Sequence, residues 1–180
     1  MHEASHAEIF GINVEHVSAD IHKMLKHKND VIHQLVSGIH FLMNKNNITV
    51  IKGCASFKDN HSVIVNNEEI KAKDIIIATG SKIAKINIPG LDLPRVLNST
   101  QALSYPHIPS SITIIGGGVI GMEFAFMYKN LGVDVHVVEY SDTLLSMIDF
   151  EASQEILNIA LNKGIHVHLS SQVTFIEEMN

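Results

Sequence analysis

The chain has 180 residues, of which 46% are hydrophobic and 18% charged, and its formal net charge is −6 at pH 7. This composition is typical of a globular protein with a buried core. No apolar run is long enough to cross a bilayer, and the basic residues are scattered, so neither a membrane nor a nucleic acid is expected as a partner.

Cysteine and histidine usage bears on redox and metal chemistry. Cys54 is the single cysteine, so no internal disulfide and no CxxC-type pair can form, and with no secretory signal we expect a reducing, cytoplasmic location. Among twelve histidines, His2 and His6 lie one helical turn apart, and His166 and His168 would share a strand face. Because no cysteine or carboxylate stands at ligand spacing from them, we expect solvated surface histidines and no metal site.

The first part of the chain predicts one long helix and several short strands. Residues 1–12 look like the end of a helix that stops at Gly11. Asp20 precedes apolar residues at helical spacing, which predict one helix, irregular near Lys28, that ends at Asn46 or Asn47. The segments "ITVIKGCASF" and "HSVIV" look like short strands, and the polar "NNEE" makes the next turn. The continuous apolar run at 75–78 predicts a strand that is buried on both faces.

The later part alternates strands and helices. Proline-bearing sequence from 82 to 111 is the best candidate for an interdomain connection. After it, the pattern predicts strands at 112–115, 133–138 and 165–169 and helices at about 119–131 and 150–163. Gly132 and Gly164 stand where helix C-caps belong, and Asp149 is placed as an N-cap. This βαβαβ series predicts an α/β fold of Rossmann type with a parallel sheet.

Three glycines in "ITIIGGGVIGMEFAF" have the spacing GxGxxG. The motif alone is weak, but here it follows an apolar strand, opens a helix and precedes Glu139, 23 residues beyond Gly116, as a dinucleotide fingerprint requires. Gly116 would permit the tight turn, Gly118 the approach of a pyrophosphate, and Gly121 the close packing of the helix on the sheet. The amides from Gly118 to Ile120, with the helix dipole, would hold the anion.

Glu139 ends the second predicted strand, where its carboxylate can accept hydrogen bonds from both ribose hydroxyls of an adenosine. A 2′-phosphate there would place like charges about 4 Å apart, which costs on the order of 4 kcal/mol at an effective dielectric near 20. The sequence therefore predicts NAD in preference to NADP.

Several stretches carry a resemblance that runs nearly from end to end: "HEASHAEIFGI", "VIHQLVSGIHFLMNKNNITVIKGCASF", "IIIATGS" with "PG" shortly after, "STQAL", "IPSSITIIGGGVIGMEFA", "LGVDVHVVE" and "IDFEAS". In order and spacing the chain resembles the central part of the flavoprotein disulfide reductases, and most closely the dihydrolipoyl dehydrogenase family. Gln101 replaces the glycine usual in "STGAL", which leaves the local turn open.

The resemblance implies a two-cofactor oxidoreductase in which electrons pass from dihydrolipoamide to a disulfide, to FAD and to NAD. It also implies a homodimer that serves an acyltransferase subunit bearing dihydrolipoamide. By position, Ala55, Thr79, Gly80 and Ser81 correspond to residues that line FAD. The implied NAD site consists of Gly116, Gly117, Gly118, Val119, Ile120, Gly121, Met122, Glu123, Glu139 and Val173, with Glu123 near the nicotinamide end.

Three parts of the family pattern are missing: the N-terminal GxGxxG for FAD, the CxxxxC redox pair, and the C-terminal dimerisation domain with its histidine and glutamate. We therefore expect residues 1–111 to form a partial FAD-binding domain and connector, and 112–180 a C-terminally incomplete NAD-binding domain. Such a piece should be catalytically inactive and bind FAD weakly or not at all. Cys54 should be an ordinary, semi-buried small residue.

Two alternatives stay open. The first is another NADH-dependent flavoprotein disulfide reductase or an NADH oxidase of the same superfamily, because these enzymes share the middle region. The second is a noncatalytic module that binds NAD(H).

Overall fold

The computed structural model describes residues 7–14, 17–84 and 86–178. Within these residues the chain forms two compact units, one from the described parts of 1–26 and 85–180, and the other from 27–84. This division follows the packing of the backbone. The assignment of 1–111 and 112–180 to two cofactor domains stays a prediction.

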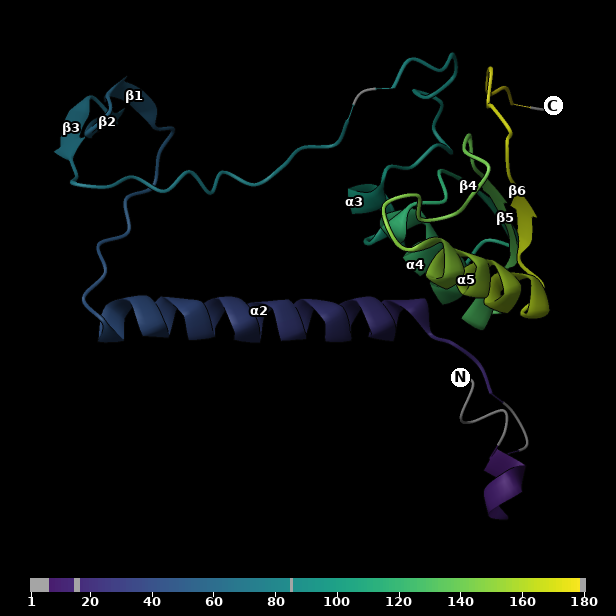
Figure 1. Cartoon of the computed structure of the whole chain (residues 1–180). Helices are drawn as coiled ribbons and strands as arrows, with labels where there is room; N and C mark the ends of the chain where they lie inside the picture. Colours follow the sequence, from purple (N-terminus) through teal and green to yellow (C-terminus); the bar gives the residue numbers. More distant parts are fainter. Residues whose placement is uncertain (1–6, 15–16, 85, 179–180) are drawn as a thin grey trace. The chain divides into compact units, whose positions relative to one another are not determined.

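A parallel sheet of three strands dominates the unit that contains the glycine motif (Figure 1). Each pair of consecutive strands, in the order β4-β5-β6, is connected by a helix, as the sequence predicts. The predicted ends agree with the observed ends to within one or two residues. The elements are β4 (Ser111–Ile115), α4 (Val119–Asn130), β5 (Asp134–Val138), α5 (Phe150–Asn162) and β6 (His166–His168).

The core lies between one face of this sheet and the two helices. Strand side chains alternate between faces, so Val135 and Val137 of β5 point to the helices and are fully buried. They belong to one hydrophobic cluster with Met122, Ala125, Tyr128, Val133, Leu144, Ala160 and Ile165. The alternate positions carry polar groups such as Thr113, Asp134 and His136, which are exposed or half-buried. The other face of the sheet is therefore polar.

Helix ends in this unit follow the sequence signals. Gly132 and Gly164 have φ values of +85° and +76°, which a residue without Cβ adopts freely after a helix. Asp149 occupies the N-cap position of α5, although its side chain makes no capping hydrogen bond. In the connector, Asn98 caps α3 (Ser99–Ala102), and the Gln101 side chain accepts a bond from the Asn98 N–H in return. Gln101 thus forms a capping box at the position where the sequence left the turn open.

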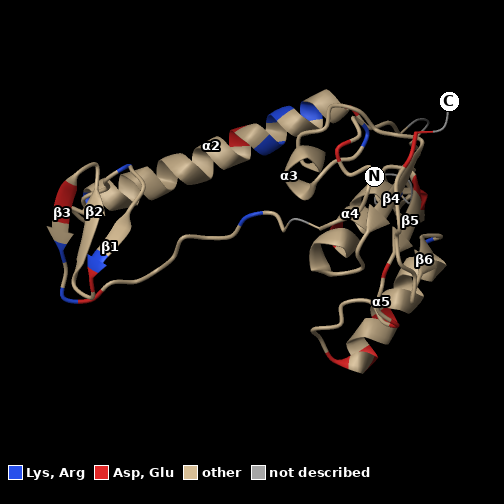
Figure 2. Ribbon diagram, turned by 90° about the horizontal axis from the view of Figure 1, so that it is seen from above, with Lys and Arg blue, Asp and Glu red and all other residues tan. Residues whose placement is uncertain are grey.

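Helix α2 (Ile21–Lys45) is continuous, which confirms the long helix but not the irregularity near Lys28. The Asp20 carboxylate accepts a hydrogen bond from the Lys23 N–H at 3.1 Å, as an N-cap does. From Val31 to Asn44 the helix carries no Lys, Arg, Asp or Glu (Figure 2). Ahead of α2, the described part of the predicted helix end is a 3₁₀ turn, η1 (Ala7–Phe10).

The unit formed by 27–84 contains an antiparallel sheet of β1 (Ser56–Asp59), β2 (Ser62–Val65) and β3 (Glu68–Lys71) in the order β1-β2-β3. "HSVIV" is confirmed as a strand, whereas the first predicted strand is shorter than expected, since residues 48–55 are irregular. Only the first two residues of the predicted turn "NNEE" form a turn, since Asn66 and Asn67 have positive φ. Glu68 and Glu69 belong to β3 and pair with β2. Two asparagines with positive φ form the tight hairpin turn.

The predicted buried strand at 75–78 is wrong. This segment has no regular structure, and Ile76 and Ile77 are 90% and 69% exposed. A strand needs a hydrogen-bonded neighbour, and no strand among the described residues pairs with this run. An apolar composition therefore does not suffice to place it in a sheet.

No helix among the described residues combines the length and the hydropathy that a bilayer-spanning helix needs.

Candidate nucleotide-binding site

The turn between β4 and α4 needs two of its glycines for steric reasons. Gly116 has φ +105°, a conformation that side chains rarely adopt, and its N–H donates to the Val138 carbonyl at 2.9 Å. A Cβ on Gly121 would lie 2.0 Å from the Gly116 carbonyl oxygen and 3.4 Å from Ile114. Gly121 therefore allows the first turn of the helix to approach the end of the strand, as the motif predicts.

Gly117 and Gly118 differ in their surroundings. Gly117 is buried, and a Cβ there would lie 2.4 Å from the side chain of Leu144 and 3.2 Å from Cβ of Glu139. Gly118 is exposed at the N-cap of α4 with φ −74°, and a Cβ there would meet no heavy atom within 4 Å among the described residues beyond its chain neighbours. Open space thus faces the helix N-terminus at the position where the motif expects a pyrophosphate.

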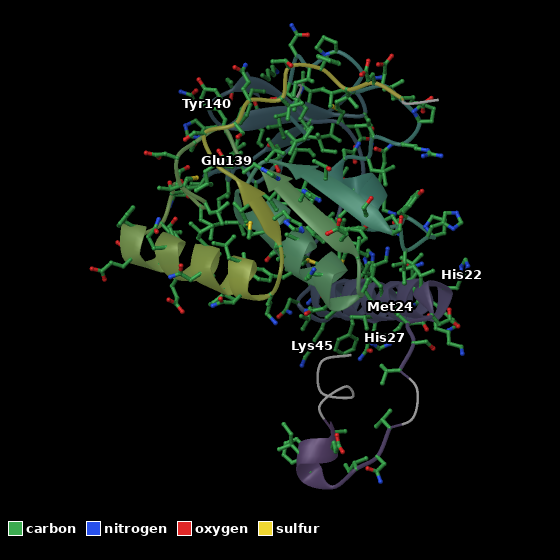
Figure 3. All side chains as sticks on the ribbon, turned by 90° about the vertical axis from the view of Figure 1, so that its right-hand side faces the viewer. His22, Met24, His27, Lys45, Glu139 and Tyr140 are labelled. Atoms are coloured by element: carbon green, nitrogen blue, oxygen red, sulfur yellow. The ribbon has the colours of Figure 1, made fainter. Side chains whose placement is uncertain are left out.

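Glu139 follows β5 directly, and Figure 3 shows it with Tyr140 at the end of the strand. One carboxylate oxygen, Oε2, accepts a hydrogen bond from the Gly117 N–H at 2.6 Å, and Oε1 accepts one from the Ser141 N–H at 2.7 Å. Burial raises the pKa of Glu139, but the N–H groups of Ser141 and Gly117 outweigh burial and hold the pKa below its ordinary value. The carboxylate is therefore ionised at neutral pH.

A hollow of about 430 Å³ lies at the carboxyl ends of β4 and β5. It brings together three predicted site residues, Gly116, Glu139 and Val173, although Val173 is distant from the other two in the sequence. The remaining lining residues are Ile86, Asn87, Ile88, Ile115, Val138, Tyr140, Ser171, Gln172 and Thr174. Crevices at the carboxyl ends of parallel strands are where open α/β sheets bind ligands.

Comparison with known proteins agrees with this geometry. Residues 3–180 match the model of the family described as "Pyridine nucleotide-disulphide oxidoreductase". The chain belongs to this family.

Relatives within the family share more than the motif. The chain is 36% identical over 179 residues to a dihydrolipoyl dehydrogenase of Bacillus subtilis, with 96% of this chain and 39% of the relative covered. A dihydrolipoyl dehydrogenase of Chlamydia pneumoniae is 38% identical over 177 residues, with 96% and 38% covered. The chain thus spans about two fifths of the length of these relatives.

A solved structure gives the same family. The HOCl-induced flavoprotein disulfide reductase RclA from Escherichia coli superposes with a TM-score of 0.78 and 32% sequence identity. The match covers 99% of this chain and 39% of RclA. The α/β fold is therefore that of a pyridine nucleotide-disulphide oxidoreductase.

Other predicted NAD-site positions of this family member differ in accessibility. Val119 and Ile120, in the first turn of α4, are 57% and 59% exposed. Met122 is only 3% exposed and belongs to the hydrophobic core, so its side chain faces away from any ligand in solvent. Glu123 is exposed on α4. Its predicted place near the nicotinamide end stays a prediction.

The positions predicted to line FAD lie in the other unit. Ala55 precedes β1, and Thr79, Gly80 and Ser81 follow the irregular run at 75–78; all four are exposed on backbone without regular structure. A hollow in this unit is lined by Asp59, His61, Ser62, Lys71, Ala72 and Lys73 and contains none of the four. Cys54 is exposed, so the expectation of a semi-buried cysteine is wrong.

Sequence reasoning missed two features near the sheet. The first is the contact of Gly117 with Leu144 and Glu139, which no local pattern encodes. The second is a carboxylate beside the histidines of β6: Asp134 Oδ1 lies 3.4 Å from His166 Nε2. No carboxylate stands at ligand spacing from His166 along the sequence, but the pairing of β5 with β6 brings Asp134 beside it, and this register was the signal that could have shown it. His2 and His6 lie outside the described residues.

Proposed function

We propose that this chain is the nucleotide-binding central part of an FAD- and NAD-dependent dihydrolipoyl dehydrogenase, and that residues 112–180 bind NAD(H). The observation that carries the proposal is the position of Glu139. Its ionised carboxylate lines the hollow at the carboxyl ends of β4 and β5, next to the glycine turn.

The residues of the hollow fit the chemistry of a dinucleotide. The first N–H groups of α4 have no partner within the helix and point toward the open space at Gly118, so they can donate to a pyrophosphate. Each Glu139 oxygen accepts one short backbone bond, and a ribose hydroxyl could replace the further contacts of the carboxylate with the Ser141 hydroxyl and the Tyr140 N–H. Because the carboxylate is charged, it would repel a 2′-phosphate, which favours NAD over NADP.

In the whole protein we propose that NAD would serve as the final electron acceptor, and that the two electrons come from dihydrolipoamide by way of a disulfide and FAD. The relatives named dihydrolipoyl dehydrogenase support this substrate. This chain has one cysteine, so it cannot form the dithiol pair that exchange with dihydrolipoamide needs. The chain by itself is therefore expected to be inactive.

Calorimetric titration of the chain with NADH, NADPH and FAD tests the nucleotide site. We expect NADH to bind and NADPH to bind at least tenfold more weakly. FAD should bind weakly or not at all, because the single GxGxxG motif in this sequence is the one at Gly116 and leaves no second loop for the FAD pyrophosphate, so purified protein should be colourless. A yellow preparation with flavin absorbance would contradict the expectation for FAD.

Gly118→Ala tests the place of the pyrophosphate without disturbing the fold. Apart from its chain neighbours, the new methyl group meets no heavy atom of the described residues within 4 Å, yet it occupies the space in front of the helix N-terminus. We expect NADH affinity to fall at least tenfold while the circular dichroism spectrum is unchanged. Gly38→Ala in α2, also with no heavy atom within 4 Å of the new Cβ, is the matched control.

Equal NADH affinity in wild type and Gly118→Ala would show that the pyrophosphate does not bind at this turn. Absence of NADH binding in the folded wild-type chain would contradict the nucleotide site as a whole. The similarity to RclA keeps a flavoprotein disulfide reductase with a different substrate as the second candidate for the longer protein.

The proposed partners follow from the family. A homodimer and an acyltransferase subunit that presents dihydrolipoamide are expected for the whole protein, and a cytoplasmic location remains an expectation from the single cysteine. The chain can be mixed with separately produced parts of a relative that supply the rest of the enzyme. Dihydrolipoyl dehydrogenase activity of this mixture would support the proposal that the chain provides the NAD-binding part.

A further inference from the structure

One carboxylate and two imidazoles converge on the polar face of the parallel sheet. Asp134 and His136 are two residues apart on β5, and His166 is the direct neighbour of His136 on β6. The Asp134 oxygens lie 3.4 Å from His136 Nε2 and 3.4 Å from His166 Nε2. One ligand atom from each residue falls within 4.8 Å of the others.

These separations suit a tetrahedral transition-metal ion. Zinc–nitrogen and zinc–oxygen bonds of about 2.0–2.1 Å place two ligand atoms about 3.3 Å apart along the edge of a tetrahedron. The two Asp134–histidine distances are close to this edge, but they start from different carboxylate oxygens, Oδ2 for His136 and Oδ1 for His166. The His136 and His166 rings stack with centroids 4.5 Å apart and an interplanar angle of 18°, so one imidazole has to rotate before both lone pairs reach the same ion. Imidazole with carboxylate is a ligand set for zinc and copper, whereas magnesium and calcium prefer oxygen alone.

His168 can fix the orientation of the His136 ring. His136 Nδ1 lies 3.3 Å from His168 Nε2, and the two rings are nearly parallel, with an interplanar angle of 6°. If Nδ1 carries the proton and donates to His168, the Nε2 lone pair of His136 faces Asp134 and His166. Ligating histidines usually donate their other N–H to a partner in this way. His168 is therefore a positioning residue.

We propose that Asp134, His136 and His166 bind a borderline divalent transition-metal ion such as Zn²⁺ or Cu²⁺ on the polar face of the sheet. A solvent molecule can complete the coordination, since Asp134 and His166 are exposed. The site is independent of the nucleotide proposal. Asp134 begins β5, whereas Glu139 follows its last residue, about 16 Å farther along the strand.

Zinc titration against a chromophoric chelator tests the site. We expect the wild-type chain to bind one Zn²⁺ equivalent with micromolar or better affinity. Asp134→Asn, His136→Gln and His166→Gln should each lower the affinity for this Zn²⁺ ion at least tenfold. His168→Gln should lower the affinity less. His40→Gln, an exposed histidine of α2, is the control for the many other histidines and should leave the strong equivalent unchanged.

Equal zinc binding in wild type and in all three ligand variants would overturn the proposal. A measurement on the unmodified chain covers the case in which a variant fails to fold. Substoichiometric Cu²⁺ should broaden the amide NMR signals of residues 134–136 and 166–168 before those of α2, because paramagnetic broadening falls steeply with distance. Broadening spread equally over all histidine-bearing segments would overturn it as well.

Discussion

The backbone N–H of Gly117 donates a hydrogen bond to Oε2 of Glu139 at 2.6 Å. The bond ties the turn after β4 to the residue after β5, at the carboxyl edge of the sheet. The Ser141 N–H occupies the other carboxylate oxygen at 2.7 Å. Glu139, which the sequence assigns to a ligand, therefore also holds the protein's own backbone.

Glu139→Gln tests this structural role. An amide has one acceptor oxygen, so its NH₂ group would face the N–H of Gly117 or Ser141, donor against donor. We expect the free energy of unfolding to fall by about 1.5–3 kcal/mol, the usual contribution of a hydrogen bond to a charged group. Urea unfolding at pH 7 measures it. Glu155→Gln, on the exposed side of α5, should change stability by less than about 0.5 kcal/mol.

The lowered pKa of Glu139 makes its contribution dependent on pH. A depressed pKa in the folded state means that the unfolded chain binds the proton more readily. The stabilisation is therefore complete above the ordinary glutamate pKa of 4.5 and is lost as the pH falls through the lower, folded pKa.

The stability difference between wild type and Glu139→Gln should therefore shrink when the pH is lowered from 6 to about 3. Urea unfolding across this range measures the difference. A difference that stays constant would mean that the carboxylate charge contributes nothing. Since both proteins carry every other titrating group, those groups cancel in the comparison.

Local patterns in the sequence predicted the βαβαβ unit and the roles of Gly116 and Gly121, because strand and helix periods and the steric needs of a tight turn are local. The role of Gly117 depends on Leu144, which reaches the turn only through packing. The prediction of a buried strand at 75–78 was wrong for a different reason. Its composition suits a buried strand, but a strand exists only with a neighbour, and composition does not supply one.

Gly121→Ala should destabilise the protein where Gly118→Ala does not. The Cβ on residue 121 would lie 2.0 Å from the Gly116 carbonyl oxygen, a rigid backbone atom, whereas the Cβ on residue 118 has open space. We expect the free energy of unfolding to fall by about 1–3 kcal/mol or more in Gly121→Ala and by less than about 1 kcal/mol in Gly118→Ala. Thermal unfolding followed by circular dichroism compares them; equal midpoints would contradict the close approach of helix and strand.

The hairpin between β2 and β3 depends on positive φ at Asn66 and Asn67, which are +52° and +65°. Asn67→Val should destabilise the hairpin by about 1–2 kcal/mol, because a branched side chain is strained in this region. Asn67→Gly should be tolerated, since glycine adopts positive φ freely. Hydrogen exchange of the amides in Ser62–Val65 reports the change, and equal protection in both variants would argue against this turn.

Leu144 links the core to the glycine turn. It is fully buried, its Cδ2 lies 2.4 Å from where a Cβ of Gly117 would be, and its carbonyl accepts a bond from the Ser153 hydroxyl at 2.6 Å. Leu144→Ala should lower the free energy of unfolding by about 2–5 kcal/mol because it leaves a cavity. Leu161→Ala, at a residue that is 50% exposed, should cost less than about 1 kcal/mol.

The same substitution should loosen the turn itself. The Leu145 N–H donates to the Gly117 carbonyl at 3.0 Å, so this amide should exchange faster in Leu144→Ala than in Leu161→Ala when both are measured under native conditions. If Leu144 supports the nucleotide hollow through Gly117, NADH affinity should also fall in Leu144→Ala and not in Leu161→Ala. Faster exchange with unchanged NADH affinity would confine the role of Leu144 to stability.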